Sequence, residues 1–128
     1  MSAEEEQLDR RVREWPRTDA TDPYRAGVES LSKSLAASLG ASARVVVAYN
    51  EFCAPSLENA IRDAVTAGAT AITVVPTMLT PGGVHSEIEI PESLAALRTS
   101  HPEVPIVYAW PFDEIALAGL LAAHVSRF

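Results

Sequence analysis

The sequence predicts an α/β fold in which helices cover a small parallel β-sheet. Three short, almost wholly apolar runs at residues 44–49, 71–76 and 104–109 have the composition of strands buried on both faces. Segments with helical periodicity separate these runs, and strands joined by helical crossovers run parallel. Ligands of such sheets bind beyond the carboxyl ends of the strands. We therefore expect function in the loops that follow the three runs.

The N-terminal segment, residues 1–23, differs from the rest of the chain. It is highly charged, and Leu8, Val12 and Trp15 recur at a helical spacing, which predicts a short amphipathic helix followed by a linker. We therefore divide the chain into this segment and an α/β domain over residues 24–128.

Four further helices are expected within the α/β domain. Asp22-Pro23 and Gly40 have the residue types of a helix start and a helix end. Pro55-Ser56 and Gly68 delimit the second helix in the same way. Pro91 begins a third helix that ends near His101, and Asp113 caps the last. Apolar faces recur along the first and last of these helices, at Val28, Leu31, Leu35 and Leu39 and at Leu117, Leu120, Leu121, Val125 and Phe128.

Composition excludes several classes of function. The 128 residues carry 10 Lys plus Arg against 17 Asp plus Glu, a balance that disfavours binding to nucleic acid. No apolar run approaches a membrane span, and the acidic N-terminus does not resemble a secretory signal. The single cysteine fits a reducing cytoplasm. No phosphate-binding, dinucleotide-binding or nucleophile-elbow motif occurs.

The loop over residues 77–90 is the strongest candidate for chemistry, because it is long for an α/β connection. Pro81-Gly82-Gly83 allows a tight backbone path. His85, Glu87 and Glu89 follow, and imidazole and carboxylate groups bind divalent metals and transfer protons. An extended segment would place the three on one side, whereas a helical one would fan them apart. The alternative is a Gly-Gly turn with solvated polar side chains.

Other polar and aromatic residues near the strand ends are weaker candidates. Glu51 lies in the loop after the first run, and Trp110 and Phe112 could stack on a flat ligand or pack at the rim. Cys53 is best explained as a packing residue. We expect His101 to be solvated and His124 to be partly buried.

Three segments together resemble the small sirohydrochlorin chelatases. They are residues 51–58, residues 74–91 with Pro81-Gly82-Gly83-Val84-His85, and Tyr108-Ala109-Trp110-Pro111. The similarity runs from about Tyr24 to the C-terminus. It implies a three-layer sandwich with flavodoxin-like strand order, a homodimer, and no organic cofactor.

The resemblance implies insertion of Co²⁺ or Fe²⁺ into a tetrapyrrole, a lyase reaction of cobalamin or sirohaem synthesis. It assigns His85 as metal ligand and proton acceptor, consistent with the two pyrrole protons that leave as a metal enters. Glu87 would act with it in catalysis, and Glu87 and Glu89 would complete the metal ligands. Gly82, Gly83 and Trp110 would contact the tetrapyrrole.

The sequence departs from this family in one respect. Family members normally begin with a strand that ends in His-Gly and supplies a second histidine, whereas no histidine here precedes His85. A shortened form, a smaller closed sheet, or exchange of elements between two chains would account for the difference. The alternative to a chelatase is therefore a non-catalytic metal- or tetrapyrrole-binding relative.

Overall fold

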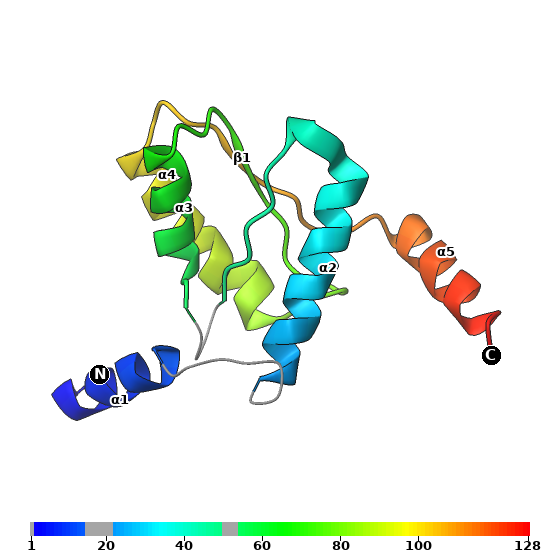
Figure 1. Ribbon diagram of the computed structural model, residues 1–128, viewed down its shortest axis with the longest axis horizontal. Helices are drawn as coiled ribbons and strands as arrows, with labels where there is room; N and C mark the ends of the chain where they lie inside the picture. Colours follow the sequence, from blue (N-terminus) through cyan, green and yellow to red (C-terminus); the bar gives the residue numbers. More distant parts are fainter. Residues whose placement is uncertain (1, 15–21, 50–53) are drawn as a thin grey trace. The chain divides into compact units, whose positions relative to one another are not determined.

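The computed structural model describes residues 2–14, 22–49 and 54–128 (Figure 1). The chain divides into two compact units between Asp63 and Ala64. Each unit is described below in chain order.

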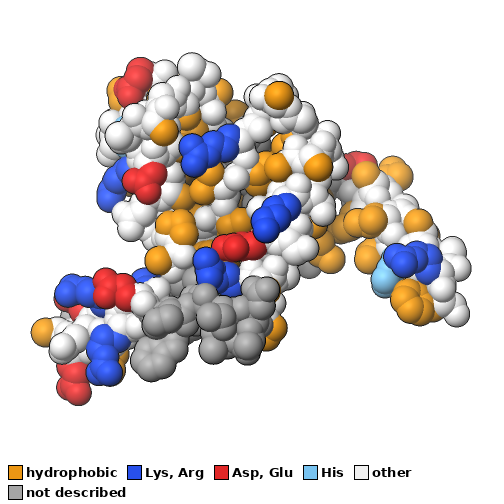
Figure 2. Space-filling model, viewed as in Figure 1, with side chains coloured by type: hydrophobic (Ala, Val, Ile, Leu, Met, Phe, Trp, Pro, Cys, Tyr) orange, Lys and Arg blue, Asp and Glu red, His pale blue; other side chains and the backbone are white. Residues whose placement is uncertain are grey.

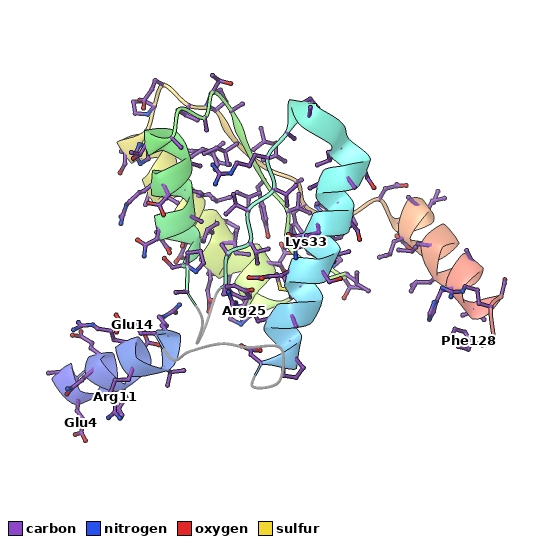
Figure 3. The ribbon with its side chains drawn as sticks, in the orientation of Figure 1. Glu4, Arg11, Glu14, Arg25, Lys33 and Phe128 are labelled. Atoms are coloured by element: carbon purple, nitrogen blue, oxygen red, sulfur yellow. The ribbon has the colours of Figure 1, made fainter. Side chains whose placement is uncertain are left out.

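The first unit begins with α1, Ala3–Arg13, and this confirms the predicted N-terminal helix. A capping box starts it: the Glu5 amide donates to the Ser2 hydroxyl at 3.1 Å, and the Ser2 amide donates to the Glu5 carboxylate at 2.6 Å. Hydrogen bonds to the Glu5 carboxylate, first from the Ser2 amide and then from the Ser2 hydroxyl, lower the pKa of Glu5. Acidic side chains, Glu4 among them, occupy the first turn, and the basic ones, including Arg11, lie in the last (Figure 3). This order suits the helix dipole, and no residue of α1 is buried.

Helix α2, Pro23–Leu39, has the predicted ends. The Asp22 carboxylate accepts from the Arg25 amide at 3.0 Å, and Gly40 ends the helix with φ +75° before the short helix η1, Gly40–Ser42. Arg25 and Lys33 mark the course of α2 in Figure 3. No residue of α2 is buried. The apolar face predicted for this helix is therefore not buried by other described residues.

The predicted first strand, residues 44–49, is not a strand, and this expectation is wrong. Only Tyr49 pairs, in a single parallel bridge with Ser56, and its amide donates to the Pro55 carbonyl at 2.9 Å. A strand needs a neighbour for its backbone groups, and the described chain supplies none along the rest of this run. Helix α3, Leu57–Thr66, follows with the Ser56 hydroxyl accepting from the Asn59 amide, and it buries Ile61.

The second unit contains the sheet, which has two parallel strands, β1 (Ile72–Val74) and β2 (Ile106–Tyr108). Ile72 lies opposite Ile106, and Val74 opposite Tyr108. The parallel α/β character is confirmed, but two strands do not make the expected three-layer sandwich.

Helix α4, Ile90–Ser100, packs on β2 and forms the core of this unit. Leu94 is fully buried, and the Arg98 Nε–H donates to the Ile106 carbonyl at 2.9 Å, tying helix to strand. Immediately before α4 lies η2, His85–Glu89. The buried apolar residues here are Ile90, Leu94, Leu97, Val104 and Ile106.

The last helix, α5, spans Glu114–Val125, and its predicted cap is confirmed because the Asp113 carboxylate accepts from the Ala116 amide at 2.9 Å. None of its residues is buried. Figure 2 shows hydrophobic side chains along its surface. The exposed large ones at this end of the chain are Ile115, Leu120, Leu121, Val125 and Phe128. Among the described helices, none has the length and apolar character that a membrane crossing requires.

Candidate functional site

The loop after β1 turns sharply at its glycine pair. Gly82 has φ +107°, a backbone conformation that favours glycine. Gly83 does not share this conformation, and a Cβ added there would lie 3.6 Å from the Ser86 hydroxyl, an ordinary contact. The tight path predicted from the sequence therefore depends on Gly82.

The segment after the turn is helical rather than extended. Residues 85–89 form η2, a single π-helical turn in which the Ile90 amide donates to the His85 carbonyl, five residues back. The Glu87 amide donates to the Gly83 carbonyl at 3.0 Å. Turns of this kind occur frequently at functional sites. Of the two conformations left open by the sequence, the helical one is correct.

His85 and Glu89 form a pair on one side of η2. His85 Nδ1 lies 2.6 Å from Glu89 Oε2. Both side chains are partly solvent-exposed, 40% for His85 and 53% for Glu89. A carboxylate at Nδ1 fixes the ring orientation and the tautomer, which makes Nε2 the nitrogen suited to accept a proton or bind a metal.

Glu87 forms hydrogen bonds with groups outside this pair. Its Oε1 accepts from the indole Nε1–H of Trp110 at 2.9 Å and from the Gly82 amide at 3.3 Å. The described residues hold no group of three histidine, cysteine, aspartate or glutamate side chains able to surround a metal ion. The structure thus brings together two of the three predicted ligands. That Glu87 joins them on a metal stays a prediction.

An aromatic row extends from the end of β2 beside Glu87. Tyr108 stacks on Trp110 with ring centroids 6.4 Å apart, and Phe112 meets Trp110 edge-on at 5.8 Å. The Tyr108 hydroxyl donates to the Ser86 carbonyl at 2.8 Å. Burial raises the pKa of Tyr108, and the charge of Glu87 raises it further.

Sequence reasoning missed Ser86 and Tyr108 as parts of this site. Ser86 is only 1% exposed, and its hydroxyl donates to the Gly83 carbonyl at 3.3 Å. A serine in a polar loop gives no signal of burial. The tyrosine that ends β2 did carry a signal, because it lies at the carboxyl end of a strand beside Trp110.

The remaining candidates lie apart from η2 in the chain. His101 is half-buried rather than solvated and ends α4, where its amide donates to the Leu97 carbonyl at 2.9 Å. His124 is exposed, contrary to expectation, with its ring 5.2 Å from that of Phe128. Glu51 and Cys53 fall outside the described residues.

Comparison with known proteins identifies what the chain is similar to. The sequence model of the family described as CbiX matches residues 20–126. A protein of Priestia megaterium described as sirohydrochlorin ferrochelatase is 30% identical over 66 residues, which is 52% of this chain. The match covers only 24% of that relative's length. No solved structure matched the chain.

Proposed function

We propose, since the chain belongs to the CbiX family of small sirohydrochlorin chelatases, that it inserts Co²⁺ or Fe²⁺ into a sirohydrochlorin-type tetrapyrrole. The family acts on a divalent metal as substrate. The observation that carries the proposal is the 2.6 Å contact between His85 Nδ1 and Glu89 Oε2. That contact provides an oriented base on a partly exposed turn.

The chemistry requires a proton acceptor close to the entering metal. Two pyrrole N–H protons leave as the metal enters the macrocycle, and a neutral imidazole is suited to accept one of them while water accepts the other. We assign the metal contact and then this proton to Nε2 of His85, because its single lone pair becomes available to a proton once the metal has moved into the macrocycle. Glu89 at Nδ1 holds the ring and stabilises the imidazolium that forms when Nε2 takes a proton.

The other predicted residues have supporting roles in the proposal. Gly82, Gly83 and Trp110 lie beside η2, where they would contact the edge of the macrocycle. Glu87 as a third metal ligand would require its side chain to leave Trp110 and Gly82. We also propose that the chain acts in the cytoplasm as a homodimer. Sedimentation of the purified chain at several concentrations would test the homodimer.

The first experiment measures metal insertion directly. The chain is mixed without oxygen with sirohydrochlorin and Co²⁺ or Fe²⁺, and the absorbance of the macrocycle is followed. We expect acceleration over the protein-free rate, and we expect His85→Gln to lose on the order of 10²-fold of it. His124→Gln is the matched control, because this histidine lies on α5.

Two outcomes would count against the assignment. A parent rate equal to the protein-free rate removes the catalytic proposal, and binding of Co²⁺ or sirohydrochlorin without insertion would then favour the non-catalytic relative. Equal rates and equal Co²⁺ affinities for His85→Gln and the parent would remove His85 from the site.

A further inference from the structure

Two hydrogen bonds join the end of β2 to η2. The Trp110 indole Nε1–H donates to Glu87 at 2.9 Å, and the Tyr108 hydroxyl donates to the Ser86 carbonyl at 2.8 Å. The residues in each pair are more than 20 positions apart in sequence. These bonds therefore define where η2 lies against the sheet, which local helix geometry does not.

One carboxylate oxygen lies at the centre of this arrangement. Glu87 Oε1 accepts from Trp110 and also from the Gly82 amide at 3.3 Å. It thus ties together the turn before η2, η2 itself and the end of β2. We call Gly82, Glu87 and Trp110 the η2 anchor.

We infer that Trp110 is a positioning residue that acts through Glu87, and that Glu87 acts as a hydrogen-bond acceptor rather than a metal ligand. The inference rests on the proposed function for the role of His85. Through the η2 anchor, Trp110 fixes the turn that carries His85 and Glu89.

Exposure explains why these side chains need such an anchor. The His85 and Glu89 side chains are 40% and 53% exposed, so packing confines them only partly. Ser86, between His85 and Glu87, is buried at 1% exposure. The orientation of the pair therefore follows from the turn beneath it, and the turn is held by Ser86 on its buried side and by Glu87 at the rim.

The aromatic row holds the donor of this bond in place. Tyr108 stacks on the Trp110 ring, and Phe112 contacts its edge. A ring fixed on two sides presents its single N–H in one direction. Trp110 therefore contributes its N–H to the site in addition to any face it offers to a flat ligand.

A hydrogen-bond acceptor and a metal ligand make different demands at position 87. An amide oxygen accepts from an indole N–H, though more weakly than a carboxylate does, whereas it is a poor replacement for a carboxylate ligand or base. Glu87→Gln should therefore retain most of the activity, and Glu87→Met, which has no comparable acceptor, should not.

The test compares Glu87→Gln, Glu87→Met, Trp110→Phe and the double variant of Trp110→Phe with Glu87→Met. Metal insertion is measured as kcat/KM for sirohydrochlorin. The loss of one hydrogen bond predicts a decrease of about two- to tenfold for Trp110→Phe. Glu87→Met should lose at least as much, because it also removes the bond from the Gly82 amide. The double variant should be no worse than Glu87→Met alone, because that change already removes the bond to Trp110. Trp15→Phe, the same change at the other tryptophan, is the control.

A second measurement does not depend on activity. The indole N–H and the His85 ring nitrogens are followed by nuclear magnetic resonance, with signals assigned from Trp110→Phe and His85→Gln. In Glu87→Met the Trp110 indole proton should shift and exchange faster with water, and the His85 signals should move. In Glu87→Gln the signals should stay near those of the parent.

Three results would overturn the inference. They are a Glu87→Gln variant as impaired as Glu87→Met, a double variant whose losses multiply, and a Glu87→Met variant whose indole and His85 signals match the parent. If the parent inserts no metal, the proposed function fails alone, because the resonance measurement still decides whether the η2 anchor positions His85.

Discussion

Helices α4 and α5 are nearly equal in length, yet only α4 contains buried residues. Helix α4 buries Ile90, Leu94 and Leu97, while α5 buries none of its residues. The sequence of α5 is the more apolar on all sides, a pattern typical of helices enclosed by other elements. An apolar sequence alone therefore does not bury a helix, because another element must also pack against it. Helix α4 has β2 as that surface.

Truncation of one leucine in each helix should give the largest difference in stability between variants of α4 and α5. Leu94 is 0% exposed and Leu120 is 65% exposed. Leu94→Ala creates a cavity and should lower the free energy of unfolding by about 2–5 kcal/mol, whereas Leu120→Ala should change it by less than about 0.5 kcal/mol. Urea unfolding followed by circular dichroism measures both. A large effect of Leu120→Ala would mean that α5 is covered in solution.

Two serines next to these helices, Ser86 in η2 and Ser126 at the end of α5, allow a second comparison of a buried with an exposed side chain. The Ser86 hydroxyl donates to the Gly83 carbonyl at 3.3 Å, and that of Ser126 donates to the Ala122 carbonyl at 2.9 Å. Ser86→Ala should cost about 1 kcal/mol, because this hydroxyl is buried, and Ser126→Ala should cost less than about 0.5 kcal/mol. The same urea measurement applies. A larger cost at Ser126 would show that bond length outweighs burial here.

The smallest expected effect concerns pH, and it compares two tyrosines. Burial and then the charge of Glu87 raise the pKa of Tyr108 above its ordinary value of 10.0. The folded state therefore holds this proton more tightly than the unfolded state does. The associated stability is fully present below about pH 10 and is lost as pH rises through the folded-state pKa.

Tyr108→Phe should reduce this alkaline loss of stability, as measured by unfolding at a series of pH values from neutral to alkaline. Tyr24, which is 68% exposed, provides the control. Tyr24→Phe should leave the slope of stability against pH unchanged. An equal slope for the parent and Tyr108→Phe would contradict the raised pKa.

Local signals in the sequence predicted most helix starts. Asp22, Ser56 and Asp113 each accept a hydrogen bond from an amide three residues ahead, which is a short-range interaction that residue type and spacing reveal. The strand expected at residues 44–49 failed for the opposite reason. A strand exists only with a hydrogen-bonding neighbour, and composition does not report whether one is present.

The candidate site divides in the same way between local and distant information. The sequence singled out His85 and Glu89, and their pairing follows from a spacing of four residues once η2 is helical. Pro91 is compatible with this helical path, because proline is accepted in the first turn of α4. The bond between Trp110 and Glu87 joins residues 23 positions apart, so no local pattern could reveal it.

The π-helical turn η2 makes the site sensitive to the length of the chain as well as to its side chains. A π turn holds one residue more than an α turn does, so deletion of Ile88 would allow the segment to continue as ordinary α-helix into α4. Each residue of an α-helix turns the chain by about 100°. A deletion that removes no polar side chain would thereby rotate His85 relative to Leu94 and the core. Two chains that differ by one residue at this turn would therefore present His85 in different directions relative to the core.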